Sequence, residues 1–472
     1  MRLKSLTANL LLVSLFLPTS ARATHHNPLT KWIVDKDCPN CYLVGISLDY
    51  LPLNEANLEN ANLRTASLRG TSFRNAYLRS ANLRRADLRD ADLTNADLRD
   101  ADLGDANLVG TQLAGANLRG ANLKRSTIDR TTVLIEKWHL VWELVNQGGQ
   151  GRGLREVDLA GAFLKKVDLS DADLTNADLE EANLTETDLE GAILTGANLK
   201  DTKLTIANLT GTNLAGANLK DADLTGANLE GANLEGANLE DAKLRGTQLK
   251  GVRLNDATQL EEKWWLVWQV VNQGKEVVEF EGIDLKSAVL LGLDLQGVNL
   301  TDANLEQAIL LESNLAGANL SQTNMKLALL ERADLTGANL NDADLRGAIL
   351  FQAKLEGADL REANLKGTNL IGTTIDSNTQ LDDRWRLVWQ LANEGGEGKD
   401  LQDFDLEEVV LIGANLRGAN LYDADLKRAT LTEANLAEAN LSEANLEWAN
   451  LVRANLTGAN LSETKLESAR LT

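Results

Sequence analysis

The sequence predicts an all-β solenoid, a coil that turns a corner in every five-residue repeat and closes a four-sided turn with every fourth repeat. Leu recurs at every fifth position along four long stretches, as in GANLEGANLEGANLE at 225–239. A small residue, most often Ala, stands two positions before each Leu, and Asn or Asp stands directly before it. All four prolines lie before residue 53, so the repeats beyond that point contain none.

A period of five fits neither a regular helix nor a straight strand. Helical residues advance by ~100° each, so the leucines would spread around the axis, and in a straight strand they would alternate between faces. A bend in every repeat keeps Leu and Ala inside and turns the other three positions to water. Backbone hydrogen bonds would join stacked coils, which excludes proline, and Asn198, Asn218 and Asn238 would form one axial column of amides.

The repeats ANLEGANLEG and ADLTNADLRD resemble the pentapeptide-repeat family, whose consensus is A(D/N)Lxx. The resemblance covers most of the chain and implies a right-handed quadrilateral β-helix. Family members with signal peptides, as in cyanobacteria, imply a place in the periplasm or the thylakoid lumen.

We expect nine segments along the chain. They are a signal peptide at 1–23, an N-terminal cap at 24–42, repeat blocks 1 to 4 at 43–131, 154–257, 280–378 and 401–472, and helix-and-loop segments at 132–153, 258–279 and 379–400.

The three segments between the blocks share a second motif, TQLEEKWWLVWQVVNQG at 258–274 being one copy. Its spacing predicts an amphipathic helix, and Thr258 with Glu261 fits a capping box. The expected apolar face consists of Leu260, Trp264, Val267, Trp268 and Val271. This face either packs over an open coil, which we favour, or is an exposed aromatic recognition motif.

Residues 1–23 have the pattern of a secretory signal peptide. Arg2 and Lys4 precede an apolar run at 10–17, which is shorter than the ~20 residues needed to span a membrane. Ala21 and Ala23 supply a small-x-small cleavage site. We therefore expect an exported protein of the periplasm, thylakoid lumen or extracellular space, without a transmembrane segment in the mature chain.

Cys38 and Cys41 are the only cysteines and are separated by two residues. In an oxidising compartment such close thiols pair, so we expect a disulfide that staples the start of the solenoid. The alternatives are a thioredoxin-like redox pair, which needs a helix N-terminus to lower a thiol pKa, and a metal site with His25 and His26.

The rest of the sequence carries no catalytic triad, zinc spacing or phosphate-binding loop. We therefore expect neither an enzyme nor a cofactor. The net charge is −22, but the acidic residues recur with the repeat and predict a solvated surface. Arginine follows Leu in six consecutive repeats of block 1, with aspartates interleaved, which predicts ion pairs rather than a nucleic-acid patch. These arginines are Arg64, Arg69, Arg74, Arg79, Arg84 and Arg89.

Block 3 breaks its own pattern by placing apolar residues beside Leu, at positions that recur once in every coil. These residues, the apolar stripe, are Val289, Leu291, Ile309, Leu311, Leu329, Ile349, Phe351 and Ile371. Contiguous exposed apolar surface marks a contact site. Either one of the chain's own helices covers the stripe, or a partner or second copy does.

These features predict an exported, non-catalytic scaffold that presents a wall or an end to a protein partner. A DNA-mimicking inhibitor of a topoisomerase, a role that some members of the family play, is the alternative, and a CxxC redox protein is a weaker one. No Trp-rich helix follows block 4, so we also expect a homodimer through the C-terminal coil, because open strand edges pair.

The signal peptide gives a direct prediction. The mature protein is expected to begin near Thr24 and to lie outside the cytoplasm, because the cleavage site follows Ala23. Intact-mass measurement of the protein purified from its source tests this. A soluble cytoplasmic form that begins at Met1 would contradict it and would favour the topoisomerase alternative.

Overall fold

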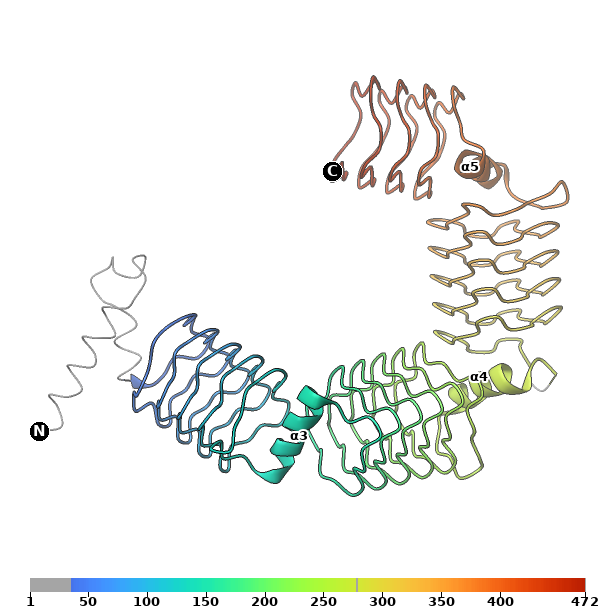
Figure 1. Ribbon diagram of the computed structural model, residues 1–472. Helices are drawn as coiled ribbons and strands as arrows, with labels where there is room; N and C mark the ends of the chain where they lie inside the picture. The colour runs from blue at the N-terminus through green and yellow to red at the C-terminus, as the bar shows by residue number, and fades with distance from the viewer. Residues whose placement is uncertain (1–34, 277–278, 472) are drawn as a thin grey trace, which may run out of the picture. The chain divides into compact units, whose positions relative to one another are not determined.

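The computed structural model describes residues 35–276 and 279–471 (Figure 1). The predicted signal peptide lies outside these ranges. The chain winds in stacked coils, and single parallel bridges join each residue before Leu to its counterpart in the next coil, as Asn62 joins Asn82. The coils form two compact units. The first contains the chain up to Leu244 together with Gly251–Glu261, and the second contains Arg245–Lys250 together with the chain from Glu262 onward.

Backbone hydrogen bonds account for the regularity of the coil. Leu58 and Asn60 donate their N–H groups to the next coil, at 2.8 and 2.9 Å, and Asn62 donates to the previous coil at 2.8 Å. Ala61 closes the corner by donating to the carbonyl of Leu58 at 3.0 Å. Four of the five N–H groups of each repeat therefore bond to backbone, as buried amides require.

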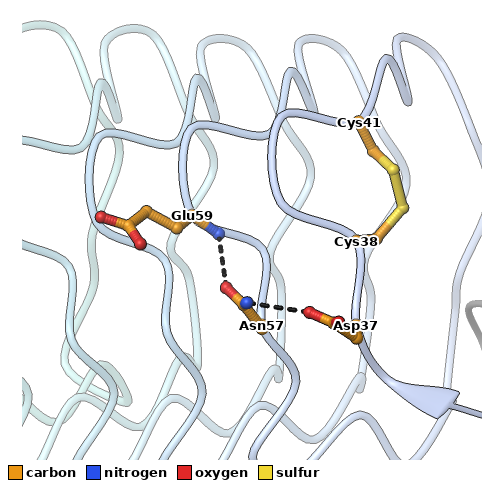
Figure 2. Close-up of a disulfide and its surroundings, with 5 residues drawn as sticks. All are labelled: Asp37, Cys38, Cys41, Asn57 and Glu59. Carbon is orange, nitrogen blue, oxygen red and sulfur yellow. Dashed lines mark hydrogen bonds between the residues drawn. A yellow bond between two sulfur atoms is a disulfide. The ribbon is translucent and has the colours of Figure 1, made fainter.

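Where Asn or Asp stands before Leu, its side chain satisfies the fifth group. Oδ1 of Asn57 accepts the N–H of Glu59 at 3.3 Å, while Nδ2 of Asn57 donates to Asp37 of the preceding coil at 2.8 Å (Figure 2). Nδ2 of Asn218 likewise donates to Asn198 at 3.2 Å, as the axial column predicts. The sequence analysis missed the bond to the backbone, which explains why Asp serves at this position as well as Asn.

Each corner requires a residue in the left-handed backbone region. Gly226 has a φ of +68°, which costs glycine little. The preceding coil places Ile206 at this position, with a φ of +58° and 63% of its surface exposed. A β-branched residue is strained there, so the corner geometry is imposed by the coil and not chosen by the local sequence.

Leu and Ala fill the interior, as expected, and Leu229 and Ala227 are completely buried. The regular pattern begins earlier than the sequence analysis placed it. Cys38 already occupies a Leu position, is buried, and donates its N–H to Asn57 at 2.8 Å. Coil structure thus starts one repeat before the expected boundary at 43.

Three helices interrupt the coils: α3 (Glu136–Gln147), α4 (Glu262–Gln273) and α5 (Asp383–Asn393). In α4 the buried residues are Trp264, Val267 and Val270. The expected face named Val271, which is only partly buried, in place of Val270. Among the described residues, no helix combines the length and the hydropathy that a membrane crossing requires.

The expected capping box at α4 is wrong. Thr258 lies four residues before the helix, in the position that Ala occupies in the repeats. Its hydroxyl donates to the carbonyl of Leu234 at 3.0 Å. Buried threonines in the repeats do the same, as Thr71 does to Leu48 at 2.7 Å. Thr258 therefore belongs to the last coil and not to the helix.

The helices complete the backbone bonding of the coils on which they pack. Nδ2 of Asn393 donates to the carbonyls of Leu370 and Trp389, at 3.1 and 2.9 Å, and its Oδ1 accepts the N–H of Gly372 at 2.6 Å. Nε1 of Trp389 donates to the carbonyl of Thr373 at 3.1 Å. The bonds at Gly372 and Thr373 replace those that a further coil would have made, which confirms the interpretation of the helix as a cover.

The coil-to-coil bonds resume directly after each helix. Gly120 donates its N–H to Gly161, and Gly367 to Glu408, each at 2.7 Å, and Gly246 donates to Ser287 at 2.9 Å. Donor and acceptor are equally far apart in the sequence in all three bonds, and about twice as far apart as in the bonds of a regular coil. Block 1 is thus bonded directly to block 2 beside α3, and block 3 to block 4 beside α5.

An ion pair repeats at the start of each helix. Lys137 pairs with Asp158, Lys263 with Asp284 at 2.9 Å, and Arg384 with Asp405 at 3.0 Å. Each cation also lies over the ring of the next residue, Trp138, Trp264 or Trp385, at 5.0, 5.3 and 4.6 Å. The cation thereby ties the helix to the first coil that follows it.

The asparagine cap gives a testable prediction. Asn393→Asp keeps the acceptor for Gly372 but removes both N–H donors and places a carboxylate against two carbonyls. We expect a loss of about 2 kcal/mol, seen as a lower Tm, because the partly buried carboxylate would have no hydrogen to donate and would face two carbonyl oxygens. Asn450→Asp is the matched control, because Asp often holds that position and Nδ2 of Asn450 is not needed by a helix. Equal Tm changes would contradict the capping role.

Candidate interaction surface

The apolar stripe of block 3 lies along one wall of the coils. Parallel bridges join Val289 to Ile309, Ile309 to Leu329, and Leu329 to Ile349. The four residues before Leu thus form one ladder, and the residues after Leu form a second column beside it. Each coil adds the same two positions to this wall.

Much of the stripe is accessible. Leu291 and Ile349 are 45% and 37% exposed. Ile309, Leu311, Leu329, Phe351 and Ile371 are partly exposed, and only Val289 is buried. A cover by the chain's own helices therefore does not hold at Leu291 and Ile349.

The structure adds Leu327, which the sequence analysis missed. It is 52% exposed and sits at a corner with a φ of +56°, next to Leu329. Its side chain lies over Gly347 of the next coil, where an added Cβ would come within 2.8 Å of Cδ2. The sequence signal was an apolar residue at a position that usually holds Gly, Asn or a charged residue.

Charges border the stripe on both sides. Lys326 and Arg346 both pair with the one carboxylate of Asp344, at 3.1 and 2.7 Å, so this edge keeps a net positive charge. On the other edge Arg332 pairs with Glu312 at 3.3 Å. Glu331 interrupts the stripe itself, where Leu311 and Phe351 occupy the same column.

Partial burial acts to raise the pKa of Asp344, but hydrogen bonds from Arg346 and Lys326 outweigh it and lower the pKa to about 2. Asp344 is thus ionised at neutral pH. Its charge stabilises the two cations beside the stripe.

Cys38 and Cys41 form a disulfide at the first described coil (Figure 2). Cys38 is 5% exposed and takes the place of an interior Leu, and Cys41 takes the place of the following small residue. The bond thus spans one corner of the coil. Among the described residues 36–43 the backbone forms turns and bridges, so neither cysteine lies at the helix N-terminus that a redox pair uses.

Within the described residues, five of the six arginines named for block 1, all but Arg64, pair with aspartates as predicted. Arg74 lies 2.7 Å from Asp92, and Arg89 lies 2.7 Å from Asp87. The hydrogen bond from Arg89 lowers the pKa of Asp87. Further pairs are Arg69 with Asp49, Arg79 with Asp100, and Arg84 with Asp105. The positive charges are thus matched locally rather than gathered in a patch.

Within residues 35–276 and 279–471, no cluster of three or more His, Cys, Asp or Glu is placed to hold a metal ion. His25 and His26, the alternative ligands for a metal at the cysteines, lie outside the described residues. His139 is 52% exposed on α3 and faces Glu143 at 3.4 Å.

The last described coil is more open than the others. Leu456, Leu461 and Leu466 are partly exposed and Leu471 is 50% exposed, whereas Leu451 of the preceding coil is buried. The homodimer expected at this coil stays a prediction.

The charged edge of the stripe predicts a pH dependence. Because the folded pKa of Asp344 is below its ordinary value of 3.8, its stabilisation is present above pH ~4 and is lost as the pH falls towards 2. Asp344→Asn is expected to cost about 1 kcal/mol at pH 7, after allowance for solvent screening, and almost nothing near pH 2. Thermal unfolding at both pH values tests this. A difference that stays constant would contradict it.

A family model described as pentapeptide repeats (8 copies) matches most of the chain, and its gaps contain the three helices. The matched residues are 56–95, 96–132, 154–191, 182–221, 192–231, 217–256, 279–310, 313–350, 349–376, 400–433 and 439–472. No curated protein matches the chain.

Several solved structures of pentapeptide repeat proteins are similar to parts of the chain. One from the cyanobacterium Cyanothece 51142 is 38% identical, with 24% of this chain and 89% of that chain covered and a TM-score of 0.22. HetL of Nostoc sp. strain PCC 7120, involved in heterocyst differentiation regulation, is 24% identical, with 76% and 100% covered and a TM-score of 0.19. A thylakoid-lumen protein of Arabidopsis thaliana is 27% identical, with 28% and 83% covered and a TM-score of 0.15. By the extent of the family match, the chain is a member of the pentapeptide repeat family.

Proposed function

We propose that this protein is an exported, non-catalytic scaffold whose block 3 wall binds a protein partner. The coils would form a right-handed quadrilateral β-helix, the hand being the one that the family implies. The observation that carries the proposal is the exposed apolar surface at Leu291, Leu327 and Ile349. A surface of apolar side chains on neighbouring coils, with charged side chains at its borders, has the composition of a protein–protein contact.

Export is proposed from the signal-peptide pattern at 1–23, with the periplasm, the thylakoid lumen or the extracellular space as destinations. The disulfide between Cys38 and Cys41 supports it, because such bonds persist in oxidising compartments.

The DNA-mimic alternative is less well supported. A mimic needs a dense array of unpaired negative charge, about one per ~1.7 Å of duplex. Here many acidic side chains are neutralised by neighbouring cations, as at Asp87, Asp92 and Asp344. The predicted signal peptide would also remove the protein from the compartment of DNA enzymes.

A binding comparison tests the proposed function. Mature wild-type protein and its variants are used as bait in the exported fraction of the source organism. Ile349→Lys is expected to abolish retention of a polypeptide that the wild type holds, because the cation cannot enter an apolar contact.

Ile193→Lys is the matched control. Ile193 also precedes a repeat Leu and is 40% exposed, but Asp173 and Asn213 flank it along the axis. This variant is expected to retain the polypeptide. Retention by all three proteins, or loss with both variants, would argue against the block 3 wall as the binding surface.

A further inference from the structure

The shape of the block 3 stripe restricts what it can bind, provided that the wall is the binding surface proposed above. Its two columns stand two residues apart, ~7 Å, while five coils extend it to ~19 Å along the axis. Lys326 and Arg346 border one side, and Arg332 with Glu312 the other. A narrow, long apolar surface between charged edges fits a slender ligand better than the broad face of a globular domain.

The spacing of the coils suits an α-helix laid along the axis. Successive turns of a helix rise by ~5.4 Å, and successive coils by ~4.8 Å. The mismatch accumulates to only ~2 Å over the length of the stripe. A helix of ~13 residues would cover all five coils, and its apolar face is about as wide as the two columns.

Glu331 argues against a second copy of this chain as the ligand. If two copies packed stripe against stripe about a two-fold axis, that symmetry axis would lie in the plane of contact. It would run either parallel to the stacking direction of the coils or perpendicular to it. Glu331 would then face an apolar residue of the stripe or the other Glu331. Both arrangements bury a carboxylate without a cation, which costs several kcal/mol.

We propose that the stripe binds one amphipathic helix of another protein, whose apolar face carries a Lys or Arg opposite Glu331 and whose edge beside Lys326 and Arg346 is acidic. The cation would neutralise the one charge within the stripe. The acidic edge would meet the two cations that share Asp344. The apolar contacts would come from Leu291, Leu327 and Ile349, the most exposed members.

A charge-swap experiment with synthetic peptides tests this. The probe is a stapled amphipathic helix of about five turns with a Leu-rich face, one Lys at its centre and Glu along one edge, and a second peptide replaces the Lys by Glu. Fluorescence anisotropy is expected to show that wild type binds the Lys peptide at least ten times more tightly than the Glu peptide. Glu331→Lys is expected to reverse this preference.

Glu230→Lys is the control for charge alone, because Glu230 is exposed and also follows a repeat Leu. It should leave the preference of the wild type unchanged. Equal affinity of both peptides for wild type and Glu331→Lys, or no binding of either at ~100 μM, would overturn the inference. We expect the wild type to form no dimer through the stripe. A dimer seen by light scattering that Ile349→Lys dissociates would therefore also overturn the inference. In each of these cases the proposed function would still stand if Ile349→Lys abolished retention of the polypeptide in the bait experiment.

Discussion

The hydrogen bond between a backbone group and its counterpart one coil away is the constraint on which the rest of this structure depends. It holds the repeats within a block to one length, because a residue gained or lost there would move the later Leu residues out of the interior. The extra residue in the bridges Gln112–Val133, Asn238–Gln259 and Asp359–Gln380 occurs only where a block ends and a helix follows. The constraint also fixes a left-handed corner in each repeat, even where the residue is Ile206 or Leu327. Side chains therefore adapt to the coil, and the interior needs only Leu and Ala.

The same constraint leaves the residue types at the outward-facing positions free to vary. The Asn or Asp before Leu adds one hydrogen bond to the coil but is not required for it, since coils with Ile309 or Leu329 at that position keep their bridges. A run of apolar residues can therefore be placed on one wall without loss of the fold. Block 3 uses this freedom at Ile309, Leu329 and Ile349. The ladder then sets the geometry of the surface, since residues one coil apart in the sequence become neighbours.

Most of the fold could be predicted from the sequence because its cause is periodic. A period of five with Leu inside has one consistent solution, and the alignment of the stripe followed from a coil of four repeats. Features that depend on single contacts could not be predicted. The second role of Asn57 and the end-capping by Asn393 need the position of particular N–H groups. Thr258 was misassigned because the same residue type caps helices and replaces Ala in coils. Leu327 was missed because the stripe was defined by the two positions beside Leu, and Leu327 stands at the corner between two repeats.

The resumption of bonding after each helix has a consequence for how such chains change in length. The bonds from Gly120 to Gly161, Gly246 to Ser287 and Gly367 to Glu408 cross α3, α4 and α5 with the same sequence separation. Each interruption therefore adds the same length of chain to a coil. A helical segment of this kind is therefore a self-contained insertion unit in evolution. It can be gained or lost between two coils by a single insertion or deletion, and the coils on either side keep their register.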